Sequence, residues 1–167
     1  MLRFKRILMV SLCFFCFACL ELGQNIEERL LNSSDMNEVQ FYAGMARKLG
    51  LDGIPIFLRV ISHSIKNPAR FIDYGKVNLC IFYLNEMAKE GRYSKESVPV
   101  LFIALKHQLY MPDTLVTAET IELITGKDIG YNHDFVTSYT DSDEPKRKEM
   151  ISKWKIMAGV PGATECR

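Results

Sequence analysis

Three histidines, five cysteines and one run of alternating oxygen ligands are the side chains that could carry chemistry in this 167-residue chain. The histidines are His63, His107 and His133. None stands in the H-E-x-x-H spacing of a zinc protease. The chain also has no G-x-S-x-G nucleophile elbow and no glycine loop that would hold a phosphate. We therefore expect no cofactor and no resident metal ion.

A catalytic pair assembled from separate helices is the enzymatic alternative. Its candidates are His63, His107, Glu86 and Asp52, because imidazoles and carboxylates are the usual general acids and bases. The two histidines are 44 residues apart, near the ends of two predicted helices. A metal site shared by them is one interpretation. A position at a helix C-terminus, where positive charge suits the dipole, is the one we favour.

The run Asp128-x-Gly130-x-Asn132-x-Asp134 alternates residues in the manner of a calcium loop. It lacks the later glycine and the bidentate glutamate of an EF-hand loop. We therefore predict a turn at this place, with no metal.

Three of the cysteines lie in an N-terminal segment that has the composition of a targeting signal. Arg3, Lys5 and Arg6 precede an uncharged run over residues 7–20. A positive region followed by an apolar run of this length predicts a secretory signal peptide over residues 1–18. A membrane-spanning helix, which needs about 20 apolar residues, and a buried N-terminal helix are the alternatives.

Cleavage after Ala18 would make Cys19 the first residue of the exported chain. A cysteine that follows a small residue in this context resembles the lipid-attachment site of bacterial lipoproteins, so Cys19 is a candidate for lipidation. Secretion without a lipid is the alternative. Cys80 is predicted to be a small core residue. A disulfide between Cys80 and Cys166 is the less favoured option in an oxidising compartment.

The exported chain is weakly acidic. Removing residues 1–18 leaves 18 lysines and arginines against 20 aspartates and glutamates. Nucleic-acid binding needs a basic surface, so we expect no nucleic-acid partner. The remaining length suits one domain. We predict a tether over residues 19–35, with an extra helical turn around Ile26 and Leu30 as the alternative, and a flexible tail over 161–167.

An internal repeat predicts the elements that would position these side chains. The stretch from Phe41 to Gly50 is echoed by that from Phe82 to Gly91, 41 residues later. Each is followed by a proline-containing apolar segment, 54–58 and then 98–102, and this second offset is 44 residues. The three additional residues fall in the connection 92–97. Loops accept insertions and packed faces do not, so this is how a true repeat varies.

Apolar residues recur in these segments with the 3.6-residue period of an amphipathic helix. The predicted buried positions are Val39, Tyr42, Ala46 and Leu49; Ile54, Leu58, Ile61 and Ile65; Val77, Ile81, Leu84 and Ala88; and Val98, Leu101, Leu105 and Leu109. Pro55 and Pro99 suit the first turn of a helix, where no intrahelical bond is lost. The predicted caps are Asp52 and Ser94 or Ser97 at the N-termini, and Gly50 and Gly91 at the C-termini.

A third, looser unit follows. We predict a helix over residues 114–125, capped by Asp113 and ended by Gly126, in which the recurring apolar residues are Leu115, Ala118, Ile121 and Ile124. After an irregular stretch, Pro145 opens a last helix with Met150, Trp154 and Met157 on one face. The cluster Lys146-Arg147-Lys148 suits an acidic partner, a lipid headgroup or solvent.

The segments Ile54-Pro55-x-Phe57-Leu58 and Val98-Pro99-x-Leu101-Phe102 resemble the second helix of HEAT-type repeats. The C-terminal part is similar to the closing unit of short bacterial HEAT-repeat proteins; the matching residues are Ala118, Ile121, Ile124, Thr125, Gly126, Gly130, Tyr131, Arg147, Ile151 and Trp154. This resemblance covers roughly residues 36–160. It implies an all-α fold, a short right-handed α-solenoid of about three helical-hairpin repeats, and a role in protein–protein scaffolding without catalytic residues.

We therefore predict a non-enzymatic, exported binding module of the bacterial envelope. It would be periplasmic or anchored to the membrane by a lipid on Cys19. Its stacked second helices would line the face that docks an unidentified protein. An immunity or inhibitor protein for a secreted toxin is a more specific version, and a purely structural envelope lipoprotein is a further alternative.

Overall fold

The computed structural model of this protein describes residues 21–66, 71–107, 111–129 and 144–158. All regular structure in these ranges is helical, which confirms the all-α class for this part of the chain. The elements are a helix over residues 21–32, α2 (Met36–Lys48), the 3₁₀-helix η1 (Gly50–Gly53), α3 (Ile54–Ser64), α4 (Phe71–Lys89), α5 (Ser97–His107), α6 (Met111–Thr125) and α8 (Glu144–Ala158). None of the described helices is both long and apolar enough to cross a membrane.

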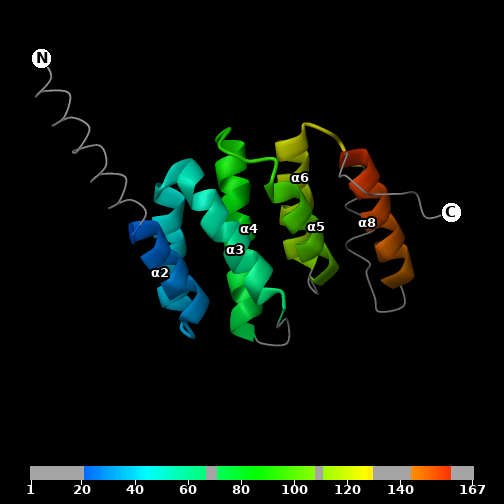
Figure 1. The fold of residues 1–167 in the computed structure, drawn as a ribbon. Coiled ribbons are helices and arrows are strands. Elements are labelled where there is room, and N and C mark those ends of the chain that lie inside the picture. Colours follow the sequence, from blue (N-terminus) through cyan, green and yellow to red (C-terminus); the bar gives the residue numbers. More distant parts are fainter. Residues whose placement is uncertain (1–20, 67–70, 108–110, 130–143, 159–167) are drawn as a thin grey trace, which may run out of the picture.

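The helices form two rows (Figure 1). In one row α2 packs against α4 and α4 against α6; in the other α3 packs against α5, and α8 contacts both α5 and α6. Helix α4 is central, because it also packs along α3. It contacts α3 and α6 more extensively than α5, the helix that follows it in the chain. The sequence predicts that α2 with α3 and α4 with α5 form two hairpins. Helix α4 is therefore held mainly by helices of the neighbouring hairpins and less by its own partner α5.

The core follows the predicted stripes closely. All four predicted positions of α4 (Val77, Ile81, Leu84 and Ala88) are buried, as are Val98, Leu101 and Leu105 of α5. Tyr42, Leu49, Leu58 and Leu115 are only partly buried, and Leu109 lies outside the described residues. The fully buried residues that the stripes omitted are mostly small or adjacent ones, such as Ala43, Phe57 and Val60. The buried faces of α3 and α4 are wider than the predicted stripes because each of these helices contacts more than one neighbour.

Three glycines end the helices of the first row. Gly50, Gly91 and Gly126 have φ angles of 64°, 74° and 65°, and no other residue of the described part has positive φ. The left-handed conformation is accessible to glycine without a steric cost, and it terminates a helix. The three predicted stops are confirmed.

The predicted N-caps differ from those observed. Asp52 lies in η1, and α3 begins after Gly53 without a side-chain cap. Asp113 lies inside α6, which begins at Met111. Ser94 accepts a hydrogen bond from the backbone N–H of Glu96 at 3.3 Å, which closes a turn before α5. The 3₁₀ turn leads directly into α3, so the chain has no extended residue there at which a side chain could cap.

Residues 21–32 form a helix of the folded unit and not the tether that their polar composition predicts. Ile26 and Leu30 are buried to 1% and 0% exposure. Glu27 accepts two hydrogen bonds from Arg59 of α3, at 2.7 and 2.6 Å, and this pairing raises the pKa of Arg59. A stripe of two apolar residues four positions apart is enough for docking because a ready apolar surface already exists on its neighbours.

Candidate functional site

The residues proposed as an acid–base pair do not converge. Asp52 precedes α3 and His63 lies in its last turn, so about 11 residues of helical rise, roughly 16 Å, separate them. Both side chains are exposed. Glu86 of α4 pairs with Lys89 at 3.6 Å. Within the described residues no hydrogen bond or ion pair joins Asp52, His63 and Glu86, and the side chain of His107 lies outside them. His63 does occupy the predicted helix C-terminus.

No three His, Cys, Asp or Glu side chains gather closely enough to hold a metal ion in the part of the chain that the structure describes. Of the calcium-like run only Asp128 is described, and it is exposed. The other predicted residues outside the described ranges are Cys19, Gly130, Tyr131, Asn132, His133, Asp134 and Cys166. Trp154 is described and is 2% exposed, in agreement with a packing role on the last helix.

Cys80 is a free, fully buried thiol of α4. Burial raises its pKa to about 12, against a smaller opposing effect from the nearby Lys76 cation. Because the thiolate is the reactive form, this cysteine is chemically inert at neutral pH. The predicted role of Cys80 as a small core residue is confirmed.

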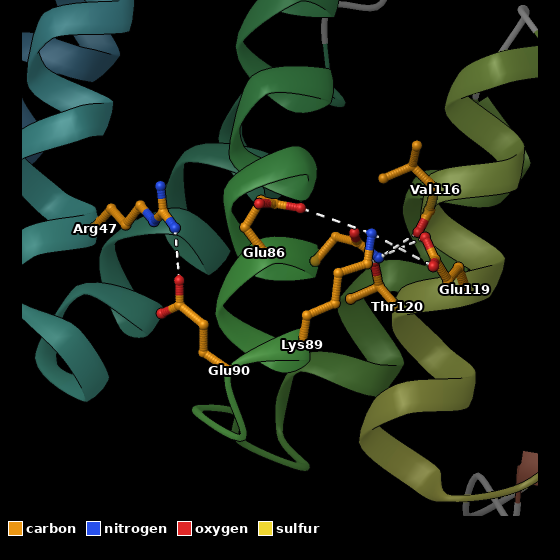
Figure 2. Close-up of polar contacts among 8 residues, drawn as sticks. Arg47, Glu86, Lys89, Glu90, Val116, Glu119 and Thr120 are labelled. Atoms are coloured by element: carbon orange, nitrogen blue, oxygen red, sulfur yellow. Dashed lines mark hydrogen bonds and ion pairs between the residues drawn. The ribbon is translucent and has the colours of Figure 1, made fainter.

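A network of charges lies across the first row of helices (Figure 2). Arg47 of α2 donates to Glu90 at the end of α4, at 2.8 Å, and Arg92 donates to the other oxygen of the same carboxylate. Lys89 lies 3.6 Å from Glu86 and 3.4 Å from Glu119 of α6. The hydrogen bonds from Arg92 and then Arg47 lower the pKa of Glu90. These exposed pairs link three successive helices, although each such pair contributes little stability by itself.

A buried amide lies beneath this network. Asn85 is 2% exposed, and its side-chain nitrogen lies 3.1 Å from both the Thr120 hydroxyl and a carboxylate oxygen of Glu119. Thr120 in turn donates to the backbone carbonyl of Val116 at 2.6 Å (Figure 2). A buried amide is stable only with such partners, so Asn85 fixes how α6 lies against α4.

Exposed aromatic side chains mark the same row. Phe41 of α2 is 63% exposed and Phe82 of α4 is 48% exposed, and they occupy equivalent places in the repeat. Each has an edge-on contact with the tyrosine that follows it. Tyr83 also stacks on Phe57 at 6.0 Å between ring centres, and Arg47 lies over it at 5.8 Å. Each phenylalanine ring is therefore packed against a neighbouring tyrosine and remains exposed to solvent.

The second row offers less apolar surface than expected. Its large exposed hydrophobic residue among those described is Ile103 of α5, whereas α2, α4 and α6 expose Phe41, Phe71, Phe82 and Leu123. The repeat pattern predicted docking on the second helices. The signal for the other row was present, because Phe41 and Phe82 both fall off the predicted buried stripes.

Lys76 of α4 holds the N-terminal helix in place. Its side chain is 2% exposed, lies 3.8 Å from Asp73, and donates to the backbone carbonyl of Leu31 at 2.8 Å. That carbonyl belongs to the last turn of the helix over residues 21–32, where unpaired carbonyls concentrate negative charge. Sequence periodicity gave no sign of this contact, because a lysine normally lies on the wet side of a helix.

A polar hollow of about 380 Å³ lies between the helix over residues 21–32 and the start of α2. The residues that line it are Asn25, Glu28, Arg29, Asn32, Ser33 and Glu38. Ser33 donates to Glu38 at 2.7 Å, and Arg29 lies 3.9 Å from the same carboxylate. The hollow is open, and all the side chains that line it are polar or charged.

Comparison of the chain with protein-family models, with curated proteins and with solved structures finds no match. The function of this chain is therefore inferred from its repeat and from the geometry of the described residues.

Proposed function

We propose that this protein is a non-enzymatic, exported binding module, and that its two rows of helices are a short α-solenoid of HEAT-like repeats. The single observation that carries the binding role is the pair of repeat-equivalent phenylalanines, Phe41 and Phe82, exposed on adjacent helices. The packing of α2 against α4 and of α4 against α6 along one row supports the solenoid.

These phenylalanines have the properties of interface anchors. Aromatic side chains bury a large area when a partner covers them, and each is worth about 1.5–3 kcal/mol on full burial. Their tyrosine neighbours and the helical backbone limit the entropy lost on binding. Anchors of this kind dominate protein interfaces when polar residues surround them.

The charge network supplies such a polar surround. Arg47 pairs with Glu90 and Lys89 pairs with Glu119, so these charges are already ordered before a partner arrives. Arg47 also lies over the ring of Tyr83, which contacts Phe82. Ordered rim charges favour correct orientation and exclude mismatched partners more than they add affinity. We therefore propose that a protein docks on the first row, across α2 and α4.

A matched pair of variants tests this face. Phe41→Ser with Phe82→Ser removes the proposed anchors, and Ile103→Ser removes an exposed apolar residue from the other row. We expect proteins captured from an envelope extract by the wild type to be lost at least about tenfold with the double variant, since 1.4 kcal/mol is tenfold. The Ile103→Ser variant should retain them. Equal capture by all three chains, with unchanged circular dichroism and melting, would contradict the assignment.

We also propose export, with lipid attachment at Cys19, on the strength of the basic residues before the apolar run 7–20. The test is membrane fractionation and fatty-acid labelling of the wild type and of Cys19→Ser. Loss of label and release from the membrane in the variant would support the anchor. A soluble, unlabelled wild type would leave simple secretion as the better account.

A further inference from the structure

The two ends of the helix rows carry opposite charge. Residues 21–40 contain five carboxylates and one arginine, whereas α8 contains four lysines, one arginine and two glutamates. The helix over residues 21–32, in blue, lies beside α2 at one end of the molecule, and α8, in orange, lies at the other (Figure 1). We propose that the acidic end of one molecule docks against α8 of a second copy, so that the chains associate head to tail.

The acidic end offers a receptor for a cation. The polar hollow there includes the carboxylates of Glu28 and Glu38 and the amides of Asn25 and Asn32. Glu38 is engaged by Ser33 and Arg29, but Glu28 is exposed and has no hydrogen bond or ion pair within the described residues. A carboxylate beside two amide oxygens is a suitable acceptor set for an ammonium or guanidinium group.

The basic end offers a donor. Lys153 of α8 has a 68% exposed side chain and pairs with Glu149, itself 64% exposed, at 2.8 Å. An exposed pair one helical turn apart is weak and exchanges readily for a carboxylate of another molecule. Helix α8 packs on α5 and α6 with its other side, through the buried Ile151 and Trp154, so Lys153 is free to meet a neighbour.

A second copy is the occupant that these observations favour. Each molecule carries both complementary ends, and the ends differ, so the contact is heterologous and leaves one free end at each side. Leu22 is the single large apolar side chain exposed in residues 21–40. The attraction is therefore electrostatic and falls as salt shortens the Debye length from about 30 Å at 0.01 M to about 4 Å at 0.5 M.

Sedimentation velocity of the purified full chain at low and high salt measures this directly. We expect the average mass to rise with protein concentration at low salt, and the association constant to fall at least about tenfold in 0.5 M salt. Glu21→Lys with Glu28→Lys reverses charges at the acidic end, and Lys146→Glu with Lys153→Glu reverses charges at the basic end. Each variant alone should be monomeric.

An equimolar mixture of the two variants is the decisive sample. The unaltered basic end of one then faces the unaltered acidic end of the other, so the mixture should regain a dimer. Asp52→Lys with Glu96→Lys makes the same change in charge at exposed sites outside residues 21–40 and α8, in η1 and in the connection between α4 and α5, and should leave association unchanged. A wild type that is monomeric at both salt concentrations overturns the proposal. Association that is insensitive to salt, or that persists in each reversal variant alone, overturns it as well.

Discussion

The internal repeat has two copies: copy one covers α2, η1 and α3, and copy two covers α4 and α5. The two copies follow one pattern and differ at a few positions. Val39 and Cys80 are equivalent and both are 0% exposed; Gly50 and Gly91 are equivalent and both have positive φ. The two copies therefore share the positions of buried residues along each helix and the residue at which the first helix ends. The differences are found where each copy meets a different neighbour.

The first difference is at the start. Copy one begins at Asp35, which caps α2 by accepting from the backbone N–H of Asn37 at 2.9 Å. The equivalent residue in copy two is Lys76, and there the helix continues backward to Phe71. This extension of α4 carries the buried Lys76, which holds the N-terminal helix, and the buried Asp73, which pairs with Lys76. A longer central helix thus ties an additional element to the array.

The second difference is in the turn. Gly53, before α3, lies so close to the Ala46 carbonyl that an added Cβ would overlap it. Its equivalent in copy two is Ser97, the first residue of α5, and copy two has three more residues in the connection that leads to it. The longer loop makes room for a side chain, but the Ser97 hydroxyl is buried and has no hydrogen-bond partner among the described residues.

The largest expected effect breaks the contact that only copy two has. Lys76→Met removes a cation from beside buried Asp73 and leaves the Leu31 carbonyl without its donor. Removing one member of a buried charged group costs about 3–5 kcal/mol of unfolding free energy. Urea unfolding measures this, and hydrogen exchange should rise first over residues 21–32. A change below 1 kcal/mol would show that Lys76 does not hold this helix.

Gly53→Ala tests the tight turn of copy one. The Cβ would force η1 away from α2, and such overpacking against the backbone costs about 3 kcal/mol. Thermal unfolding is the measurement. The matched change in copy two, Ser97→Ala, provides the control, and equal effects at the two sites would break the comparison.

Cys80→Val gives copy two the residue of copy one and should remove a pH dependence. The pKa of the Cys80 thiol is about 12 in the folded protein and about 8.5 when unfolded. Only the unfolded state ionises between these values, so stability is unaffected below pH 8 and falls as pH rises. The loss reaches about 2 kcal/mol by pH 10. The difference in unfolding free energy between wild type and variant, followed from pH 7 to pH 10, should change by this amount; parallel curves would argue against it.

Asn85→Ala removes the buried amide that joins α4 to α6. Copy one has Gly44 at this place, where the neighbouring Tyr83 hydroxyl lies within van der Waals distance of an added Cβ. Loss of the hydrogen bonds to Thr120 and Glu119 should cost about 1–2 kcal/mol. Denaturant unfolding measures the cost, and Asn85→Ala in a Thr120→Val background should cost less if the two residues are coupled.

Ser97→Ala has the smallest expected effect and the opposite sign. The hydroxyl is buried and has no partner in the part of the chain that the structure describes, so its removal should stabilise the protein by up to about 1 kcal/mol. A rise of a few degrees in melting temperature is the expected readout. A clear destabilisation would mean that the hydroxyl is hydrogen-bonded in solution.

The predictions that the structure confirms are mainly those to which a local rule of helix geometry applies. The positive-φ glycines and the buried stripes of α4 and α5 follow from helix geometry and apolar spacing alone. The predictions were least reliable at the N-caps and over residues 21–32, because 3₁₀ geometry and docking depend on neighbours distant in the chain. The candidate surface shows the same limit: spacing showed that Phe41 and Phe82 are equivalent, but not that both stay exposed.

The sequence by itself determined that this chain repeats a helical unit, where each first-row helix ends, and that a loop absorbs the three-residue difference between copies. These properties are local, since φ restrictions and helical period act within a few residues. The tertiary structure alone decided that α4 packs chiefly on α3 and α6, that Lys76 reaches the N-terminal helix, and that Phe41 and Phe82 are exposed. A periodic stripe specifies which residues share a face, whereas the neighbour that covers a face is set by packing across the whole molecule.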